Sequence, residues 1–292
     1  MSAKGNEREE TSMPLCEATD SVRLYYEDFG DGEALVFICA GVQTHKMWEG
    51  QAAGLSDRFR TIAYDWRGTG ASDKPRTGYT GDAAAADLTA LVENLGAAPA
   101  VLIGHGIGSH VALLAAEKRP DLVKALVLAS SGPWFCGDRD GIVGGLSDEF
   151  MAFMAERTDL KHDRGLSHAD AMADLGAGWL FHHPQSDALN FSVLEQALTW
   201  PQFVLAEYLK TMREIDHRER LKGIDCPTLI IQGRHDRKQR YEGAVYMRDN
   251  IPGARLVTLE ESAHMGQVEE INAFNDAVAT FVAELAGVER AA

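Results

Sequence analysis

Strand-like apolar runs alternate with amphipathic helical stretches along most of this chain, and this alternation limits its fold more than any other feature. Short apolar runs occupy residues 34–39, 61–64, 100–103, 124–129, 229–232 and 255–259. Helical patterns lie between them, for example over residues 81–95 and 107–118. A strand, a helix and a second strand in succession require a crossover, which produces a parallel sheet covered by helices on both faces. We therefore predict an α/β fold with a mostly parallel, doubly wound sheet.

The alternation stops between residues 133 and 224, where helical patterns rich in aromatic side chains replace the strands. We expect this segment to form a helical cap on a core made of residues 21–132 and 225–288. Residues 1–20 are polar, lack the apolar run of a signal peptide, and are expected to form a flexible tail. Gly30, Asp31 and Gly32 follow the alternating residues 22–29, and this pattern predicts a hairpin into residues 34–39.

Charge and composition narrow the range of partners. The 292 residues carry a formal net charge of −16 without an evident basic patch, which disfavours binding to nucleic acid or to an anionic membrane surface. Four scattered cysteines indicate neither a disulfide framework nor a zinc motif. We expect a cytoplasmic protein that binds a small molecule and needs no cofactor, and the oligomeric state stays open.

Residues 104–108 read Gly-His-Gly-Ile-Gly and separate a predicted strand from a predicted helix. Glycines two residues either side of a central position are typical of the nucleophile elbow G-x-S-x-G, in which a strained turn exposes the central side chain. Here the central residue is Gly106, which suits the turn but carries no hydroxyl. A dinucleotide-binding G-x-G-x-x-G is the alternative, but its third glycine would fall on Ser109.

Asp236 and His264 follow two later strands of the predicted sheet. Asp236 comes after the apolar residues 229–232, and His264 comes after residues 255–259. Both side chains therefore emerge at the carboxyl ends of parallel strands, the edge at which such sheets bind ligands. In this arrangement the carboxylate orients the imidazole, whose Nε2 then faces the elbow. The sequence thus predicts a catalytic set in which Gly106 occupies the position of the nucleophile.

Two motifs together resemble the α/β-hydrolase superfamily. Residues 65–73, Asp-Trp-Arg-Gly-Thr-Gly-Ala-Ser-Asp, are similar to that family's D-x-R-G-x-G-x-S loop, and residues 104–108 are similar to its G-H-S-x-G elbow. The resemblance extends over nearly all of the chain after the tail and implies an α/β-hydrolase fold with a helical cap. Ile107 resembles the branch whose nucleophile is serine, so serine is the residue expected at position 106.

The resemblance also implies an oxyanion hole and a pocket. The backbone N–H of Ile107 would form one half of the hole, and that of Val42, or alternatively Gly41, the other half. We expect Gly41 and His105 beside the substrate, together with Trp134 and Trp179 from the aromatic cap residues Trp134, Trp179, Phe181 and Trp200. His162, His168, His182 and His183 lack ligand spacing, so no metal site is predicted.

These residues predict a hydrolase of the ester or lactone type that acts on a neutral or hydrophobic substrate through serine, aspartate and histidine. As written, the chain lacks the nucleophile. We favour an engineered Ser-to-Gly change that traps substrate. The alternative is a natural protein without a nucleophile, either a lyase or cofactor-free oxygenase that uses His264 as its base, or a non-catalytic protein that binds a small ligand.

Overall fold

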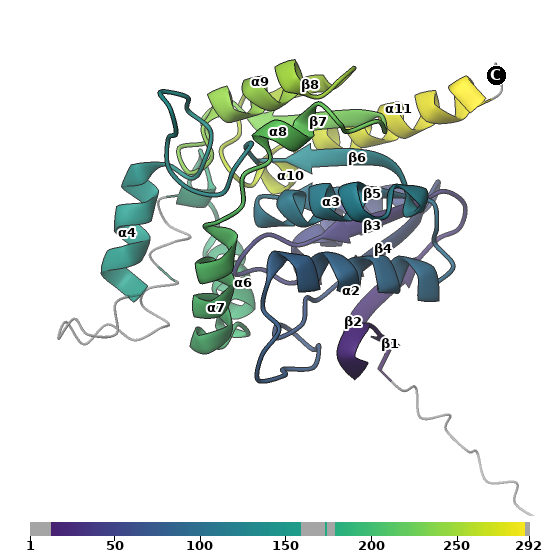
Figure 1. Ribbon diagram of the computed structural model, residues 1–292, viewed down its shortest axis with the longest axis horizontal. Helices are drawn as coiled ribbons and strands as arrows, with labels where there is room; N and C mark the ends of the chain where they lie inside the picture. The colour runs from purple at the N-terminus through teal and green to yellow at the C-terminus, as the bar shows by residue number, and fades with distance from the viewer. Residues whose placement is uncertain (1–12, 159–172, 174–178, 290–292) are drawn as a thin grey trace, which may run out of the picture.

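The computed structural model describes residues 13–158, 173 and 179–289. Eight strands form one sheet in the order β1-β2-β4-β3-β5-β6-β7-β8 (Figure 1). The strands from β3 onward are parallel to one another, whereas β2 pairs antiparallel with both β1 and β4. The predicted α/β fold with a mostly parallel sheet is confirmed. The strands are β1 (Leu15–Glu17), β2 (Arg23–Phe29), β3 (Ala34–Ile38), β4 (Arg60–Tyr64), β5 (Ala100–His105), β6 (Val123–Ala129), β7 (Thr228–Gly233) and β8 (Arg255–Leu259).

The beginning of the sheet differs from the prediction in two ways. The expected hairpin between β2 and β3 is wrong, because β4 lies between them and pairs with both. The glycines after β2 therefore redirect the chain across one strand position instead of into a tight turn. The expected tail is also shorter, because Leu15–Glu17 forms β1 against β2. A strand of three residues is too short to show a periodicity in the sequence.

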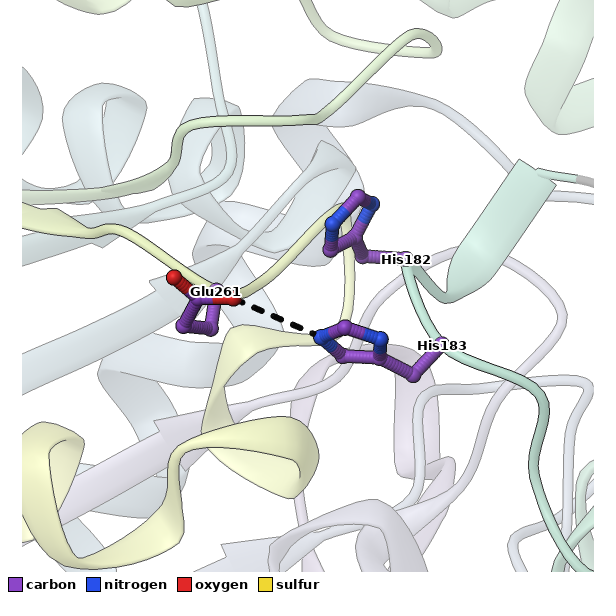
Figure 2. Close-up of side chains that lie close together, drawn as sticks. All are labelled: His182, His183 and Glu261. Carbon is purple, nitrogen blue, oxygen red and sulfur yellow. Dashed lines mark ion pairs between the residues drawn. The ribbon is translucent and has the colours of Figure 1, made fainter.

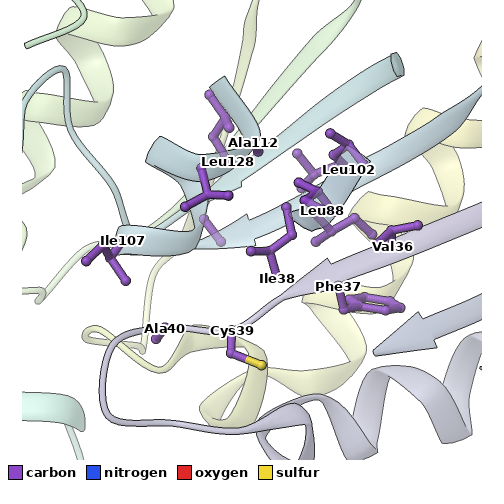
Figure 3. Packing of buried hydrophobic residues seen from close by; sticks show 14 of the residues in the cluster. Val36, Phe37, Ile38, Cys39, Ala40, Leu88, Leu102, Ile107, Ala112 and Leu128 are labelled. Atoms are coloured by element: carbon purple, nitrogen blue, oxygen red, sulfur yellow. The ribbon is translucent and has the colours of Figure 1, made fainter. Parts of the chain in front are cut away.

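Side chains of β3 alternate between two apolar layers. Val36 and Ile38 lie on the side of α2 (Gly81–Asn94) and α3 (Ile107–Lys118), together with Leu88 and Ala112 of those helices (Figure 3). Phe37 points the opposite way, and its ring centre lies 5.1 Å from that of Trp48. Successive side chains of a strand point to opposite faces, so the fully buried β3 has a packed layer on each face.

The remaining helices lie around this sheet. Helices α4, α6 and α7, which belong to the segment between β6 and β7, gather beyond the carboxyl ends of the strands (Figure 1). In the part of the chain that the structure describes, no helix is long and apolar enough to cross a bilayer. The bounds are α1 (Glu49–Leu55), α4 (Asp148–Thr158), α6 (Asp187–Leu198), α7 (Gln202–Met212), α8 (Arg218–Leu221), α9 (Tyr241–Asn250), α10 (Gly266–Glu269) and α11 (Ile271–Glu289), with short 3-10 turns at Thr19–Ser21, His45–Trp48 and Pro120–Leu122.

Candidate active site

A sharp turn joins β5 to α3, and Gly106 stands between the last residue of the strand and the first residue of the helix. Its backbone has φ 54° and ψ −118°, a combination that strains any residue with a Cβ. The two flanking glycines serve close packing instead. A Cβ on Gly104 would stand 2.6 Å from the carbonyl carbon of Gly108, and one on Gly108 would stand 2.5 Å from the backbone oxygen of Ile38. The backbone conformation therefore favours glycine at position 106, whereas close packing requires it at positions 104 and 108.

The space beside Gly106 faces His264. A Cβ placed on Gly106 would lie 3.6 Å from His264 Nε2 and 3.9 Å from the backbone oxygen of Ser130. Both are ordinary van der Waals distances, so the site has room for a Cβ. A hydroxyl attached to that Cβ and rotated toward the imidazole would be within hydrogen-bond reach of Nε2.

Asp236 holds the other side of the same imidazole. The Nδ1 atom of His264 lies 2.8 Å from Oδ2 of Asp236, and both side chains are buried. The carboxylate also accepts hydrogen bonds from Gln232 Nε2 and from the backbone N–H groups of Lys238 and Gln239. Since Asp236 is surrounded by donors, we assign the Nδ1–H tautomer to His264, which leaves the lone pair on Nε2 directed away from the acid.

Burial sets the protonation of these groups. Desolvation holds the pKa of His264 well below its usual range, and the nearby Lys238 lowers it further. Desolvation raises the pKa of Asp236 and lowers the pKa of Lys238 to about 8. In the described part of the chain, Nε2 of His264 has no hydrogen-bond partner. The site therefore presents a neutral, unpaired imidazole nitrogen to the tip of the elbow, as a general base requires.

The predicted oxyanion donors lie on adjoining backbone segments. Ile107 is the first residue of α3, and the first N–H groups of a helix have no partner within the helix. Val42 adopts a positive φ of 59° in the turn after β3. A Cβ on Gly41 would lie 3.6 Å from a side-chain carbon of Ile107, so this turn is packed against the elbow. Gly41, Val42 and Ile107 all line one cavity with Gly106 and His264.

That cavity is mainly apolar and extends from the elbow to the helices beyond the strand ends. Its lining consists of Ala40, Gly41, Val42, Gly106, Ile107, His110, Phe135, Leu146, Phe150, Met151, Trp200, Leu205, Tyr208, Leu209, Arg213, Lys238, Gln239 and His264. Trp200 belongs to the aromatic set expected to include pocket residues. Its indole N–H donates to the carbonyl of Gln43, which ties α7's start to the turn that carries Val42.

Three expected substrate contacts lie outside this lining. His105 is fully buried, and its Nε2 donates to the backbone carbonyl of His264 at 2.7 Å, so it supports the histidine loop from behind. Trp134 donates to Gly137 and packs under the guanidinium of Arg218. Trp179 packs behind Phe150, which itself lines the cavity. The directions of these three side chains depend on the path of the backbone in and around irregular segments. The pattern of residue types in the sequence does not reveal that path.

Two cationic residues of the lining have no counterpart in the sequence-based prediction. Lys238 is 9% exposed, and its ammonium lies 5.0 Å from the ring centre of Phe150. Arg213 follows α7 and is exposed at the edge of the cavity. Lys238 lies two residues after Asp236, so its proximity to the site was visible in the sequence, but the direction of its side chain was not. His162 and His168 lie outside the described residues.

Comparisons with known proteins identify the family of this chain. A family model described as the alpha/beta hydrolase fold matches residues 33–271. The AB hydrolase superfamily protein YisY of Bacillus subtilis is 31% identical over 265 residues, covering 90% of this chain and 96% of that protein. A non-heme chloroperoxidase of Streptomyces lividans is 31% identical, with 86% of this chain and 93% of that protein covered. Among solved structures, the esterase EaEST from Exiguobacterium antarcticum is 28% identical with a TM-score of 0.83, covering 92% of this chain and 98% of its own.

The family model spans the sheet from β3 to the start of α11, and it therefore includes the elbow, the acid and the histidine. The relatives match across nearly their whole lengths, so the similarity is not confined to one motif. The chain belongs to the α/β hydrolase fold family.

Proposed function

We propose that this chain is a disarmed hydrolase of esters or lactones, in which Gly106 replaces a serine nucleophile, by an engineered substitution, and leaves a pocket that binds substrate without cleaving it. Asp236 orients His264, and the N–H groups of Ile107 and Val42 serve as oxyanion donors. Helices α4, α6 and α7 act as a cap over the pocket. The esterase name of one relative at 28% identity supports the ester chemistry.

One observation carries the proposal. The unpaired Nε2 of His264 faces the position of a side chain at residue 106, where a Cβ would fit at 3.6 Å. A buried polar atom without a partner is unfavourable, so an unpaired nitrogen aimed at the tip of the elbow calls for a hydrogen-bond partner at that point. A serine hydroxyl at position 106 would supply the missing partner and would itself be activated by the imidazole.

The direct test restores the hydroxyl. We expect Gly106→Ser to hydrolyse p-nitrophenyl acetate and to react with a fluorophosphonate probe, both in a His264-dependent manner. Gly106→Ala is the matched control, because it adds the Cβ without the hydroxyl and should stay as inactive as the parent. If the serine and alanine forms hydrolyse the ester equally slowly and neither reacts with the probe, the proposed chemistry at residue 106 is wrong.

The cations of the lining change the expected substrate class, from a neutral substrate to one with an anionic group. The sequence predicted a neutral or hydrophobic substrate, and apolar side chains such as Phe135, Phe150 and Leu205 support an apolar body. Desolvation lowers the pKa of the Lys238 ammonium although the carboxylate of Asp236 offsets part of this effect, so a further anion beside the ammonium would be favourable. We therefore propose that the substrate also carries one anionic group, for example a carboxylate, which Lys238 binds inside the cavity and Arg213 attracts at its edge.

A natural protein without a nucleophile is the second candidate. Gly106 is compatible with this reading, because glycine adopts φ 54° with ψ −118° without the strain that an elbow serine bears in the same turn. In such a protein His264 would remove a proton from a bound substrate, or the pocket would bind a ligand without chemistry. A single-turnover assay of the glycine form against esters, lactones and enolisable ketones separates these cases. Fast turnover that His264→Ala abolishes supports the lyase or oxygenase, whereas tight binding without turnover supports the disarmed hydrolase or a binding protein.

A further inference from the structure

A cluster of metal-binding side chains lies on the surface outside the cavity. His182, His183 and Glu261 come from segments almost eighty residues apart, yet their side chains lie close together, with His183 directed at Glu261 (Figure 2). Each offers one ligand atom, and the three atoms lie within 4.8 Å of one another. Nε2 of His183 lies 3.7 Å from a carboxylate oxygen of Glu261. All three residues are exposed, so a hydrated ion can reach them.

A fourth residue holds the two segments together. One carboxylate oxygen of Glu269 accepts hydrogen bonds from the backbone N–H groups of His182 at 2.7 Å and His183 at 3.0 Å. Its other oxygen accepts from the N–H of Ala263 at 2.8 Å, in the loop that carries Glu261. Glu269 therefore fixes the backbone of both histidines against the loop that carries Glu261. This clamp lowers the entropy lost when the three side chains converge on an ion.

The ring of His182 is also restrained. The rings of His182 and His235 stack with centroids 3.7 Å apart and an interplanar angle of 6°. The stack limits rotation of the His182 ring, whereas the side chains of His183 and Glu261 are exposed and have room to change rotamer. Such adjustment is needed, because ligand atoms around zinc lie roughly 2.0–2.2 Å from the ion for nitrogen and oxygen.

We propose that His182, His183 and Glu261 bind a divalent transition-metal ion, with zinc the best match, and that water completes its coordination. Two imidazoles and one carboxylate suit Zn²⁺, whereas Ca²⁺ and Mg²⁺ prefer sets made entirely of oxygen ligands. The net charge of −16 also favours a cation at the surface. No metal site was predicted from the sequence, because Glu261 approaches the histidine pair only in the folded chain.

The position of the site gives it a structural consequence. Glu261 lies three residues before His264, and the N–H of Met265 donates to the carbonyl of Leu180. A bound ion would add a further link between the histidine loop and the segment that leads into α6. We expect zinc to stabilise the loop of His264 by linking it to that segment.

Isothermal titration of the untagged full chain with zinc chloride tests the proposal. We expect one equivalent to bind, and we expect His183→Ala and Glu261→Gln each to weaken binding by at least about 10-fold. Glu260→Gln is the matched control, because Glu260 is the exposed neighbour that pairs with Arg234 and offers nothing to the site. His264→Ala shows whether zinc binds instead in the cavity, and it should leave the titration unchanged.

Two further results are decisive. His235→Phe keeps a flat ring against His182 but removes a nitrogen, and it should bind zinc like the parent. The melting temperature of the parent should rise with zinc, and that of Glu261→Gln should rise less. The proposal is overturned if the parent binds no zinc, if His183→Ala and Glu261→Gln bind it as the parent does, or if binding disappears in His235→Phe or His264→Ala. Circular dichroism confirms that each variant is folded.

Discussion

The Nε2 atom of His264 lies 3.6 Å from the point at which a Cβ on Gly106 would stand, and no group in the described residues hydrogen-bonds to it. The rest of His264 is held by hydrogen bonds, since its ring Nδ1 is bonded to Asp236 and its backbone carbonyl accepts from His105 and Ser130. A histidine so firmly oriented, with one free nitrogen aimed at an elbow, is organised for proton transfer to or from whatever lies at that point.

The three glycines of the elbow should differ in their tolerance of a Cβ. Gly106→Ala should lower the free energy of unfolding by only about 1–3 kcal/mol, because its cost is backbone strain and its Cβ would make only ordinary van der Waals contacts. Gly104→Ala and Gly108→Ala should cost more or prevent folding, because the Cβ would meet backbone atoms at 2.6 Å and 2.5 Å. Chemical denaturation of the three variants measures how much free energy of unfolding each one loses. A larger loss in Gly106→Ala than in the other two would contradict the geometry of the turn.

Asp236 should matter for turnover once a nucleophile is present. In the Gly106→Ser background, Asp236→Asn replaces the acceptor of the Nδ1–H of His264 and disturbs its tautomer, so kcat should fall by about 10³–10⁴-fold. Glu260→Gln in the same background is the control and should retain the activity. Steady-state hydrolysis of p-nitrophenyl acetate gives both values. An unchanged kcat in Asp236→Asn would remove Asp236 from the proposed machinery.

Substitutions of Trp200 and Trp134 should have different effects, the first on substrate binding and the second on stability. Trp200 lines the cavity, whereas Trp134 packs against Arg218 and Tyr246 outside the lining. In the Gly106→Ser background, Trp200→Phe should raise KM for an apolar ester by several-fold, on the order of 1 kcal/mol of lost contact. Trp134→Phe should lower the melting temperature and leave KM unchanged. The opposite result would mean that the lining of the cavity has been assigned to the wrong tryptophan.

Two stacked histidines should make the fold sensitive to acid. His110 and His217 are buried with ring centroids 5.2 Å apart, and burial lowers the pKa of His217 from 6.5 to about 4. The unfolded chain therefore takes up a proton at a higher pH than the folded chain does, and stability falls as the pH drops below about 6.5. For His217 the loss between about pH 7.5 and about pH 5 is roughly 2 kcal/mol.

The matched variant is His217→Phe, which keeps a flat ring against His110 and cannot be protonated. We expect urea denaturation at both pH values to show that this variant loses less free energy of unfolding in acid than the parent does. The difference should be about the 2 kcal/mol given for His217. An equal loss in both proteins would mean that other groups dominate the acid response.

The elbow could be predicted because its determinants are local. Glycine spacing, a preceding strand and a following helix all lie within residues 100–118, and each has a direct backbone cause in the structure. Asp236 and His264 could be placed for a related reason, since the carboxyl ends of parallel strands meet at one edge whatever the strand order. The strand order itself was harder, because the pairing of β2 with β4 instead of β3 depends on the whole sheet.

Side-chain direction was the part that the sequence did not reveal. Trp134 and Trp179 were expected in the pocket on the basis of residue type, but the irregular path of their segments turns them elsewhere. Lys238 was overlooked although it lies two residues from Asp236, because nothing in its neighbourhood indicates whether its ammonium faces solvent or the cavity. His183 and Glu261 were missed because they meet only through tertiary packing.

Lys238 should make substrate choice depend on pH. Desolvation lowers its pKa to about 8, so the ammonium that would bind an anionic substrate is present below that pH and is lost above it. In the Gly106→Ser background, KM for a mono-p-nitrophenyl ester of succinate should therefore rise as the pH increases through about 8. KM for the neutral p-nitrophenyl butyrate should stay level over the same range.

Lys238→Met should raise KM for the succinate ester at about pH 7 by roughly 10-fold or more, a loss of about 1.4 kcal/mol or more. It should also abolish the pH dependence of that KM. Lys238→Arg keeps a charge that does not titrate in this range, so its preference for the anionic ester should persist above pH 8. Because both esters report on the same restored nucleophile, hydrolysis of the neutral ester alone would contradict the anionic substrate while leaving the catalytic assignment intact. Hydrolysis of neither ester would contradict the catalytic assignment itself.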